Sequence, residues 1–231
     1  MLRAVIFDMD GVLVDSHPVH INLWKELLAS ARITVDDEEL EVIRDGNSKE
    51  ELFRHFMDNI SHEQLQNYTE EKDRLYREKS RGLRTVRGVR ELLATLMDAR
   101  ISAAVASSGS SWRVHQTLDL FGLRDYFAAV VTASEVGVGK TNSRIFLTTA
   151  ELLQVTSEDL LVFEDSAAAI RSATSVGMKC VGIAEPSRAT ALLEAGATSV
   201  FPDFFEISLN NLHLIFDGAP ERTSTQCVGL A

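Results

Sequence analysis

The fold is decided by the stretch Ala4-Val5-Ile6-Phe7-Asp8-Met9-Asp10-Gly11-Val12-Leu13-Val14-Asp15-Ser16. Residues 5–7 are apolar and do not alternate with polar residues, which predicts a strand that is buried on both faces. Asp8 follows at the carboxyl end of that strand, where open α/β sheets hold their ligands. Gly11 allows a sharp turn and a close approach of the backbone to a bound group. A carboxylate at this point can act as a nucleophile, and a second one, Asp10, can transfer protons.

Two kinds of pattern follow along the chain. Residues 17–81 have helical periodicity, with apolar faces near residues 23–28, 40–43, 52–56 and 65–76, and no convincing strand. From residue 86 onward, short apolar runs alternate with amphipathic segments. Expected strands are 101–106, 128–131, 160–163, 179–183 and about 199–201, and expected helices are 90–100, 112–121, 143–153, 167–176 and 189–195. Such alternation is typical of right-handed strand–helix–strand units in a parallel sheet.

The first strand must join this sheet, because alone it cannot bury both of its faces. We therefore predict an α/β fold, a Rossmann-like parallel sheet core with an inserted all-helical domain. The predicted core comprises residues 1–14 and 84–216, and the helical insertion comprises residues 15–83. The polar, pattern-free residues 217–231 are expected to form a disordered tail.

Composition limits the possible partners. The 231 residues carry a formal net charge of −11, which argues against binding to nucleic acid or to an anionic membrane, since both need a basic surface. The chain has no apolar run long enough for a transmembrane helix and no signal-like segment before the first strand. The two cysteines, Cys180 and Cys227, lie in an apolar run and in the polar tail, so we expect no disulfide framework. These features predict a cytoplasmic protein. They leave a small metabolite as the expected partner, and we expect a monomer or weak homodimer, which the composition itself does not decide.

Small hydroxyl residues follow the expected strand at 101–106. Ser107, Ser108, Ser110 and Ser111 surround Gly109 in front of an expected helix. Hydroxyls and backbone N–H groups before a helix can hold phosphate oxygens. Serines can equally cap the helix. The residues alone leave both interpretations open.

Two adjacent carboxylates, Glu164 and Asp165, follow the expected strand at 160–163. With Asp8 at the same edge of the sheet, each like-charged pair about 4 Å apart costs roughly 4 kcal/mol at an effective dielectric constant near 20. A hard divalent cation would relieve that repulsion, and Mg²⁺ is the usual choice beside phosphate. The alternative role for Asp165 is to cap the helix that follows.

One lysine stands out by its surroundings, Lys140 in Glu135-Val136-Gly137-Val138-Gly139-Lys140-Thr141. The end of this segment is similar to a phosphate-binding P-loop. That motif requires a glycine where this chain has Ser134 and a strand that leads directly into the loop, so we reject it. A lone lysine is usually a solvated surface residue, and its function depends on its neighbours in the fold.

The segments around Asp8, Ser107, Lys140 and Glu164 resemble, in the same order, the four motifs of the haloacid dehalogenase-like (HAD) hydrolase superfamily. The first motif, DxDGxxxDS, matches residues 8–16. An all-helical insertion directly after it is typical of the subclass with a cap domain at that place, and of its β-phosphoglucomutase-like and phosphatase branch.

The resemblance implies a role for each matching residue. Asp8 is the implied nucleophile, Asp10 the implied proton carrier, and Ser107 and Lys140 the implied ligands of the phosphoryl oxygens. The implied Mg²⁺ ligands are Asp8, Asp10 through its backbone carbonyl, Glu164 and Asp165. The implied substrate-binding residues are Gly11, Ser108, His20 and Lys49. His20 could instead be an ordinary half-buried histidine and Lys49 a surface lysine, and we expect Trp24 to lie in the core of the cap.

The implied activity is that of a Mg²⁺-dependent phosphatase. It would hydrolyse a small phosphate monoester, such as a sugar phosphate, through an aspartyl-phosphate intermediate. The nearest alternative is a phosphomutase of the β-phosphoglucomutase type, which typically carries a Lys-Asn pair where this chain has the uncharged Ser110 and Ser111. A dehalogenase needs no metal and leaves Glu164 and Asp165 without a role. A non-catalytic binding module would require an incomplete site.

Overall fold

The computed structural model describes residues 1–57 and 59–218. It contains a six-stranded sheet with the strand order β3-β2-β1-β4-β5-β6, in which all pairings are parallel. The strands are β1 (Ala4–Phe7), β2 (Ser102–Ser107), β3 (Ala129–Thr132), β4 (Leu160–Glu164), β5 (Lys179–Ile183) and β6 (Ser199–Phe201). The helices are α1 (His17–Ser30), α2 (Lys49–Phe56), α3 (His62–Lys79), α4 (Val89–Asp98), α5 (Ser111–Leu120), α6 (Ala133–Val136), α7 (Arg144–Leu153), α8 (Ala167–Thr174), α9 (Pro186–Glu194) and α10 (Leu209–Asp217). The predicted α/β fold with a parallel sheet is confirmed.

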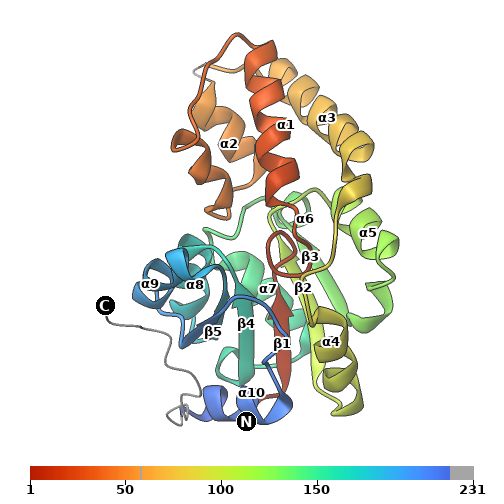
Figure 1. Ribbon diagram of the computed structural model, residues 1–231, viewed down its shortest axis with the longest axis vertical. Helices are drawn as coiled ribbons and strands as arrows, with labels where there is room; N and C mark the ends of the chain where they lie inside the picture. The colour runs from red at the N-terminus through yellow and green to blue at the C-terminus, as the bar shows by residue number, and fades with distance from the viewer. Residues whose placement is uncertain (58, 219–231) are drawn as a thin grey trace, which may run out of the picture.

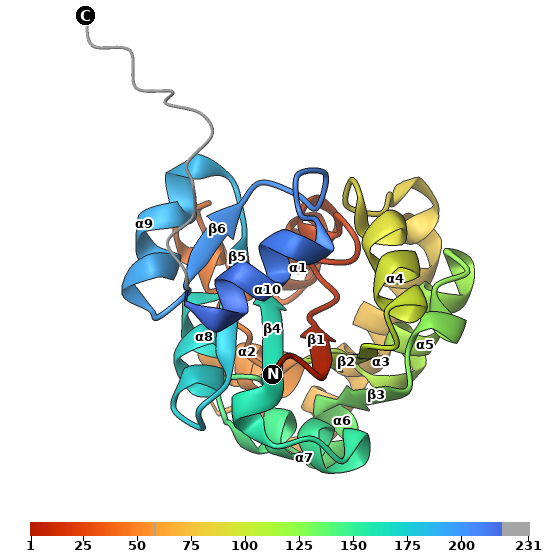
Figure 2. The same cartoon turned by 90° about the horizontal axis from the view of Figure 1, so that it is seen from below.

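The strand β1 lies inside the sheet, and its four side chains are fully buried. Val5 and Phe7 belong to the apolar cluster on one face, where α4, α5 and α10 pack. Ala4 and Ile6 belong to the cluster on the other face, where α7, α8 and α9 pack. Figure 2 shows helices on both sides of the sheet. Burial on both faces explains why this strand is an unbroken apolar run.

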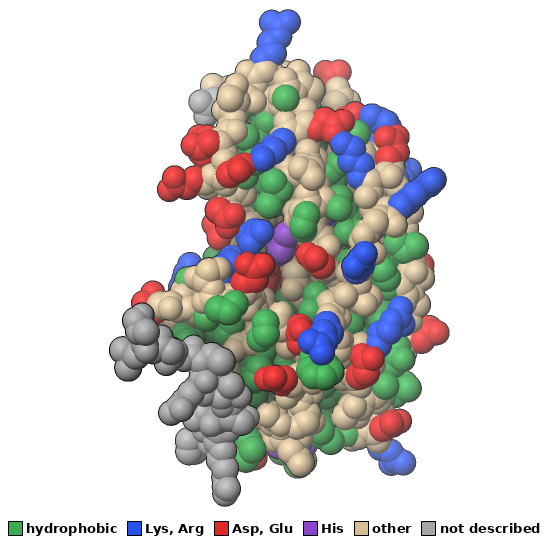
Figure 3. Space-filling view, viewed as in Figure 1, with side chains coloured by type: hydrophobic (Ala, Val, Ile, Leu, Met, Phe, Trp, Pro, Cys, Tyr) green, Lys and Arg blue, Asp and Glu red, His purple; other side chains and the backbone are tan. Residues whose placement is uncertain are grey.

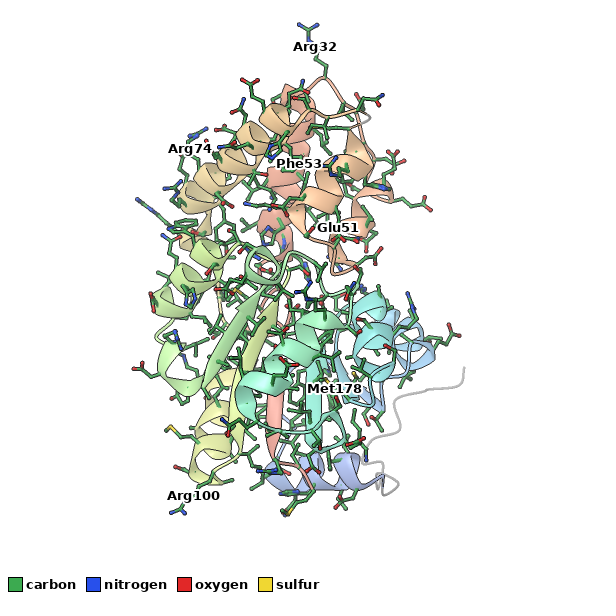
Figure 4. All side chains as sticks on the ribbon, turned by 180° about the vertical axis from the view of Figure 1, so that it is seen from behind. Arg32, Glu51, Phe53, Arg74, Arg100 and Met178 are labelled. Carbon is green, nitrogen blue, oxygen red and sulfur yellow. The ribbon has the colours of Figure 1, made fainter. Side chains whose placement is uncertain are left out.

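The inserted segment forms a helical block, made of α1, α2 and α3, over the carboxyl ends of the strands (Figure 1). Its interior is aromatic: the ring of Trp24 lies 4.6 Å from that of Phe53, which lies 5.7 Å from that of Tyr68. Figure 4 shows Phe53 between the helices of the block. Trp24 is 1% exposed, which confirms its predicted place in the core of this block.

The two connections between the sheet and the helical block run side by side. The backbone N–H of Asp15 donates to the carbonyl of Arg84 at 2.9 Å, and that of Val86 donates to the carbonyl of Leu13 at 3.0 Å. These bonds lie close to the predicted junctions at 14/15 and 83/84, whose placement as domain boundaries stays a prediction.

A loop of the helical block also contacts the edge of the sheet directly. The carbonyl oxygen of Gly46 accepts hydrogen bonds from the backbone N–H of Lys140, at 3.1 Å, and from the hydroxyl of Ser108. The loop can approach this closely because Gly139 has no side chain: a Cβ atom there would lie 2.7 Å from the backbone nitrogen of Ser48. The contact therefore depends on glycine at this position.

Three expectations need correction. The segment near residues 40–43 forms a 3₁₀ helix (Glu39–Arg44), which begins where the Asp36 and Glu39 side chains each accept a hydrogen bond from the other's backbone N–H. The helices α6 and α10 were not predicted, and α10 begins at the capping side chain of Ser208. Asp217, placed in the predicted tail, ends α10, and residues 219–231 of that tail lie outside the described residues.

No described helix is long and apolar enough to cross a membrane.

We predict that Gly139→Ala pushes the helical block away from the sheet. The added methyl group would meet the backbone nitrogen of Ser48 at 2.7 Å, the carbonyl oxygen of Gly46 at 3.0 Å and Glu51, which lies on the edge of α2 that faces the sheet (Figure 4). The expected cost is roughly 1–3 kcal/mol of unfolding free energy, with a larger radius of gyration in small-angle scattering. Gly82→Ala is the control, since a Cβ there meets no atom within 4 Å. If the two variants had the same unfolding free energy and the same radius of gyration, the close contact between Gly139 and the helical block would be contradicted.

Candidate active site

A cavity lies between the helical block and the carboxyl edge of the sheet. It is lined from the sheet side by Asp8, Asp10, Ser108, Arg113, Lys140 and Asp165, and from the block by His17, His20, Lys49, Lys72 and Asp73. Figure 3 shows a histidine side chain at this junction, with acidic and basic side chains around it. The cavity thus brings together seven of the ten predicted site residues, while Gly11, Ser107 and Glu164 do not line it.

Asp8 sits directly after β1, where its backbone N–H donates to the carbonyl of Phe163 at 3.0 Å. Its carboxylate lies 2.7 Å from the Nζ atom of Lys140, which also contacts Glu164. Burial and the carboxylates of Glu164 and Asp165 raise the pKa of Asp8 well above its ordinary value, against the opposing charge of Lys140. Burial would lower the pKa of Lys140, but the carboxylates of Asp8 and Glu164 raise it, so the ammonium stays charged.

Asp165 stands at the end of β4 beside a histidine of the helical block. The Nε2 atom of His17 lies 2.5 Å from Oδ2 of Asp165, and Arg188 reaches the same oxygen at 3.6 Å. Gly11 has a φ of +81°, and a Cβ atom there would meet His17 and lie 2.6 Å from Oδ2 of Asp165. Glycine is therefore required at position 11 both by its backbone conformation and by this crowding.

These acidic side chains have the donor chemistry of a hard cation site. One carboxylate oxygen each from Asp8, Glu164 and Asp165 lies within 4.8 Å of the other two, and all three residues are buried. The combined negative charge of the three buried carboxylates is larger than the single positive charge of Lys140 beside them. A divalent cation would therefore lower their mutual repulsion. The side chain of Asp10 faces Arg113 and not this cluster. The assignment of Asp10 as a ligand through its backbone carbonyl stays a prediction.

The Asp10 carboxylate is enclosed by hydrogen-bond donors. Its Oδ1 accepts from the Ser16 hydroxyl at 2.5 Å and lies 3.0 Å from Nε2 of His20. Arg113 donates to both oxygens, at 2.9 Å and 2.6 Å. Burial would raise the pKa of Asp10, but Arg113 and His20 hold it well below its ordinary value. Burial lowers the pKa of His20 to about 4 although Asp10 opposes this, so His20 is neutral, and its Nε2 atom also lies 3.3 Å from Nη1 of Arg113.

The two predicted serines make different contacts. Ser107 is fully buried, and its Oγ atom accepts a hydrogen bond from the backbone N–H of Gly109 at 3.1 Å. Ser108 lines the cavity, donates to Gly46 of the helical block and accepts from the backbone N–H of Lys140 at 3.0 Å. In this arrangement Ser107 shapes its own loop and Ser108 joins the loop to the block.

Lysines of the helical block face the same cavity. The Nζ atom of Lys49 lies 2.8 Å from Asp73, which the hydroxyl of Ser110 also approaches at 3.4 Å. Lys72 is buried, with its ammonium 5.4 Å from the centre of the Trp24 ring. Within the part of the chain that the structure describes, no carboxylate forms an ion pair with Lys72. Burial and the nearby charges of Arg113 and Lys49 lower the pKa of Lys72 to about 7.

Sequence reasoning missed five charged or titratable cavity residues: His17, Arg44, Lys72, Asp73 and Arg113. His17 follows the first motif directly, and its place one residue beyond Ser16 could have marked it as close to the site. Lys72 and Asp73 lie in a charged stretch of α3 that reads as a solvated face, since its sequence contains many exposed charges. Arg113 lies in an amphipathic helix, where an arginine is usually exposed.

A family model and the most similar relatives place the chain in the same family. A family model described as haloacid dehalogenase-like hydrolase matches residues 5–183. A phosphorylated carbohydrates phosphatase from Thermotoga maritima is 31% identical over 207 residues, which cover 86% of this chain and 94% of that protein. A β-phosphoglucomutase from Bacillus subtilis is 31% identical over 195 residues, which cover 80% of this chain and 84% of that protein.

A comparison of structures finds proteins of the same kind. The crystal structure of a β-phosphoglucomutase from Clostridium difficile superimposes with a TM-score of 0.82 and covers 94% of this chain and 98% of that one. Its sequence is 24% identical, so this likeness concerns the fold alone.

We predict that Lys72→Met stabilises the protein and that the gain depends on pH. The folded-state pKa is about 7, against 10.5 for an unperturbed lysine. Between these values the unfolded chain holds a proton that the folded chain has released, so wild-type stability rises with pH across this window. The gain from Lys72→Met should therefore be largest at pH 7 and below, on the order of 2 kcal/mol, and should shrink as the pH approaches 10.

Chemical denaturation at several pH values measures this gain. Lys79→Met is the matched control, because Lys79 is 41% exposed and pairs with Glu26 on the surface. A gain that does not change with pH, or one that both variants share, would contradict the burial of an unpaired ammonium at position 72.

Proposed function

The chain belongs to the haloacid dehalogenase-like hydrolase family, and from this premise we propose that it is a Mg²⁺-dependent phosphatase of small phosphorylated metabolites, with phosphorylated carbohydrates as its substrate class. The observation that carries the proposal is the buried grouping of Asp8, Lys140, Glu164 and Asp165, of which Asp8, Lys140 and Asp165 line the cavity between the sheet and the helical block. The relative from Thermotoga maritima is named as a phosphatase of phosphorylated carbohydrates.

The proposed reaction has two steps. In the first, an oxygen of Asp8 attacks the phosphorus of the ester, a bond from Asp8 to phosphorus forms, and the bond to the ester oxygen breaks. Asp10 would deliver a proton to the departing oxygen, for which it must first be protonated although Arg113 and His20 hold its pKa below the ordinary value. In the second step, water attacks the aspartyl-phosphate, Asp10 takes its proton, and inorganic phosphate leaves while the Asp8 carboxylate is restored. Positioned proton transfer of this kind typically contributes 10²–10⁴-fold to the rate.

The other polar side chains stabilise charge on the phosphoryl group. Lys140 would offset the negative charge that develops on the phosphoryl oxygens, and the loop of Ser107 and Ser108 would donate hydrogen bonds to them. Asp8, Glu164 and Asp165, with the backbone carbonyl of Asp10, would hold Mg²⁺. When bound, this ion supplies Lewis acidity toward a phosphoryl oxygen and neutralises part of the carboxylate charge.

The helical block would exclude water and bind the remainder of the substrate. Its Lys49, Lys72 and His20 face the cavity, and their donors suit hydroxyl or anionic groups of a sugar phosphate. We retain the cytoplasmic location and the monomeric or weakly dimeric state as predictions.

A sugar phosphomutase is the second candidate, because the relative from Bacillus subtilis carries that name at the same identity. Against it, Ser110 has no charge to offer a second phosphate, and its hydroxyl already approaches Asp73 of the helical block. We expect phosphate release from a panel of hexose phosphates, 2-phosphoglycolate and nucleotides. Conversion of β-glucose 1-phosphate to its 6-phosphate in the presence of a bisphosphate primer, without phosphate release from any compound, would establish the mutase.

We predict that Asp8→Asn abolishes phosphate release while the protein stays folded. The amide cannot attack phosphorus, and the loss of one crowded carboxylate leaves the unfolding midpoint unchanged or higher. The control is Asp15→Asn, which changes an exposed carboxylate of the same motif and should leave turnover near the wild-type rate. Residual turnover of Asp8→Asn within about tenfold of the wild type would remove the nucleophile assignment.

We predict that Mg²⁺ raises the unfolding midpoint of the wild-type protein and that EDTA stops its turnover. The ion binds the folded chain through carboxylates that repel one another in its absence, so it stabilises by mass action. Asp165→Asn should weaken the response of the midpoint to Mg²⁺ by at least about tenfold in ion concentration. An undiminished response in this variant, measured by calorimetry, would place the ion elsewhere.

A further inference from the structure

An arginine that the four motifs do not include contacts the proposed proton carrier. Arg113 is the third residue of α5 and its side chain is 6% exposed. Its guanidinium donates to both carboxylate oxygens of Asp10, at 2.9 Å and 2.6 Å. A planar guanidinium that binds a carboxylate through two parallel bonds fixes the plane of that carboxylate as well as its position.

The helical block covers the other side of the same guanidinium. Its carbon atom lies 5.3 Å from the centre of the Tyr76 ring, and His20 stacks on that ring at 5.3 Å. One turn further along α5, the hydroxyl of Tyr76 lies 3.2 Å from that of Thr117. The helix α3 therefore packs on α5 at two successive turns around Arg113.

The floor beneath the guanidinium is also shaped to receive it. A Cβ atom at position 109 would collide with the guanidinium of Arg113, so Gly109 leaves the space that Arg113 fills. Arg113 is thus held by the loop after β2, by Asp10 and by the helical block, and its rotation is restricted on all three sides.

We propose that Arg113 is a positioning residue: it fixes the Asp10 carboxylate in the orientation that receives the proton of the attacking water, and Tyr76 holds it there when the helical block is closed. This rests on the proposed function, and it adds a residue outside the four motifs. A carboxylate displaced by about 1 Å can lose on the order of 10²-fold in rate. If Arg113 only ties α5 to the loop after β1, its removal lowers the stability of the protein. The ratio between the rates of the two reaction steps then stays as in the wild type.

An aryl phosphate separates the two steps. The p-nitrophenolate ion departs without a proton donor, so the formation of aspartyl-phosphate from p-nitrophenyl phosphate does not need Asp10. The attack of water still requires removal of a proton. A misplaced Asp10 therefore slows the second step alone with this substrate, and phosphorylated enzyme accumulates.

The experiment is rapid-mixing kinetics of Arg113→Met with p-nitrophenyl phosphate and Mg²⁺. We expect a burst of p-nitrophenolate close to one equivalent per enzyme, followed by turnover roughly 10- to 100-fold slower than the wild type. Acid quenching and mass spectrometry should find the added phosphate on Asp8. In Arg113→Ala, added guanidinium chloride at millimolar concentration should restore part of the turnover, because it refills the vacated space.

The double variant tests whether Arg113 acts through Asp10. In an Asp10→Asn background, Arg113→Met should change turnover by less than about twofold, because the group that it positions is already gone. Arg77→Met is the control, an arginine of the same junction that packs on Trp112, and it should show no burst. If Arg113→Met is less stable, Arg113→Lys keeps the positive charge and an N–H donor and should show a smaller loss of turnover.

The outcomes separate the two proposals. The role of Arg113 alone would be overturned if Arg113→Met turned over at the wild-type rate without a burst. It would also be overturned if Arg113→Met lost the same factor in turnover with and without the Asp10 carboxylate. Failure of Asp8→Asn to abolish turnover, or silence of the wild-type protein on every phosphate ester, would overturn the proposed function and this inference with it.

Discussion

The crowding of carboxylates at the carboxyl edge of the sheet is the constraint on which the rest of the structure depends. Asp8 directly follows β1, and Glu164 and Asp165 are the last residue of the neighbouring β4 and the one after it, so the pairing of these two strands itself brings the three together. Buried carboxylates that repel one another destabilise the fold unless positive charges or hydrogen-bond donors offset them. Lys140 supplies part of it from a loop between α6 and α7, and two backbone N–H groups bind one oxygen of Glu164. The site is therefore prepared for a further positive charge.

The sequence was sufficient for the parts of the molecule that repeat a simple pattern. The unbroken apolar run of residues 5–7 is typical of a strand covered on both faces, and the carboxyl ends of parallel strands meet at one edge. From these two facts follow the fold and the convergence of Asp8, Asp10, Lys140 and Asp165 on one cavity. The roles of these residues are those that the resemblance implies.

The sequence was insufficient where contact depends on how two distant helices pack. Arg113 reaches Asp10 because α5 begins shortly after β2, the strand that pairs with β1, and because Gly109 leaves room, and neither fact can be read from the local pattern of α5. Lys72 belongs to a helix whose other charges are exposed, and only the packing of α3 against Trp24 buries it. The helix α10 was missed because its nine residues carry a short apolar face next to a polar tail.

The side-by-side connections of the helical block have a consequence for how the chain folds. The strand β1 must find β2 and β4, and Ala4 pairs with Ser102 and Leu160, both far along the chain. Such distant pairings are slow, because closing a long loop costs entropy before any contact repays it. Since Asp15 and Arg84 are bonded to each other, a helical block that collapses first brings residues 13–15 and 84–86 together and reduces the connection between β1 and β2 to residues 8–15 and 84–101. The insertion would then act as a kinetic aid to the sheet that it interrupts.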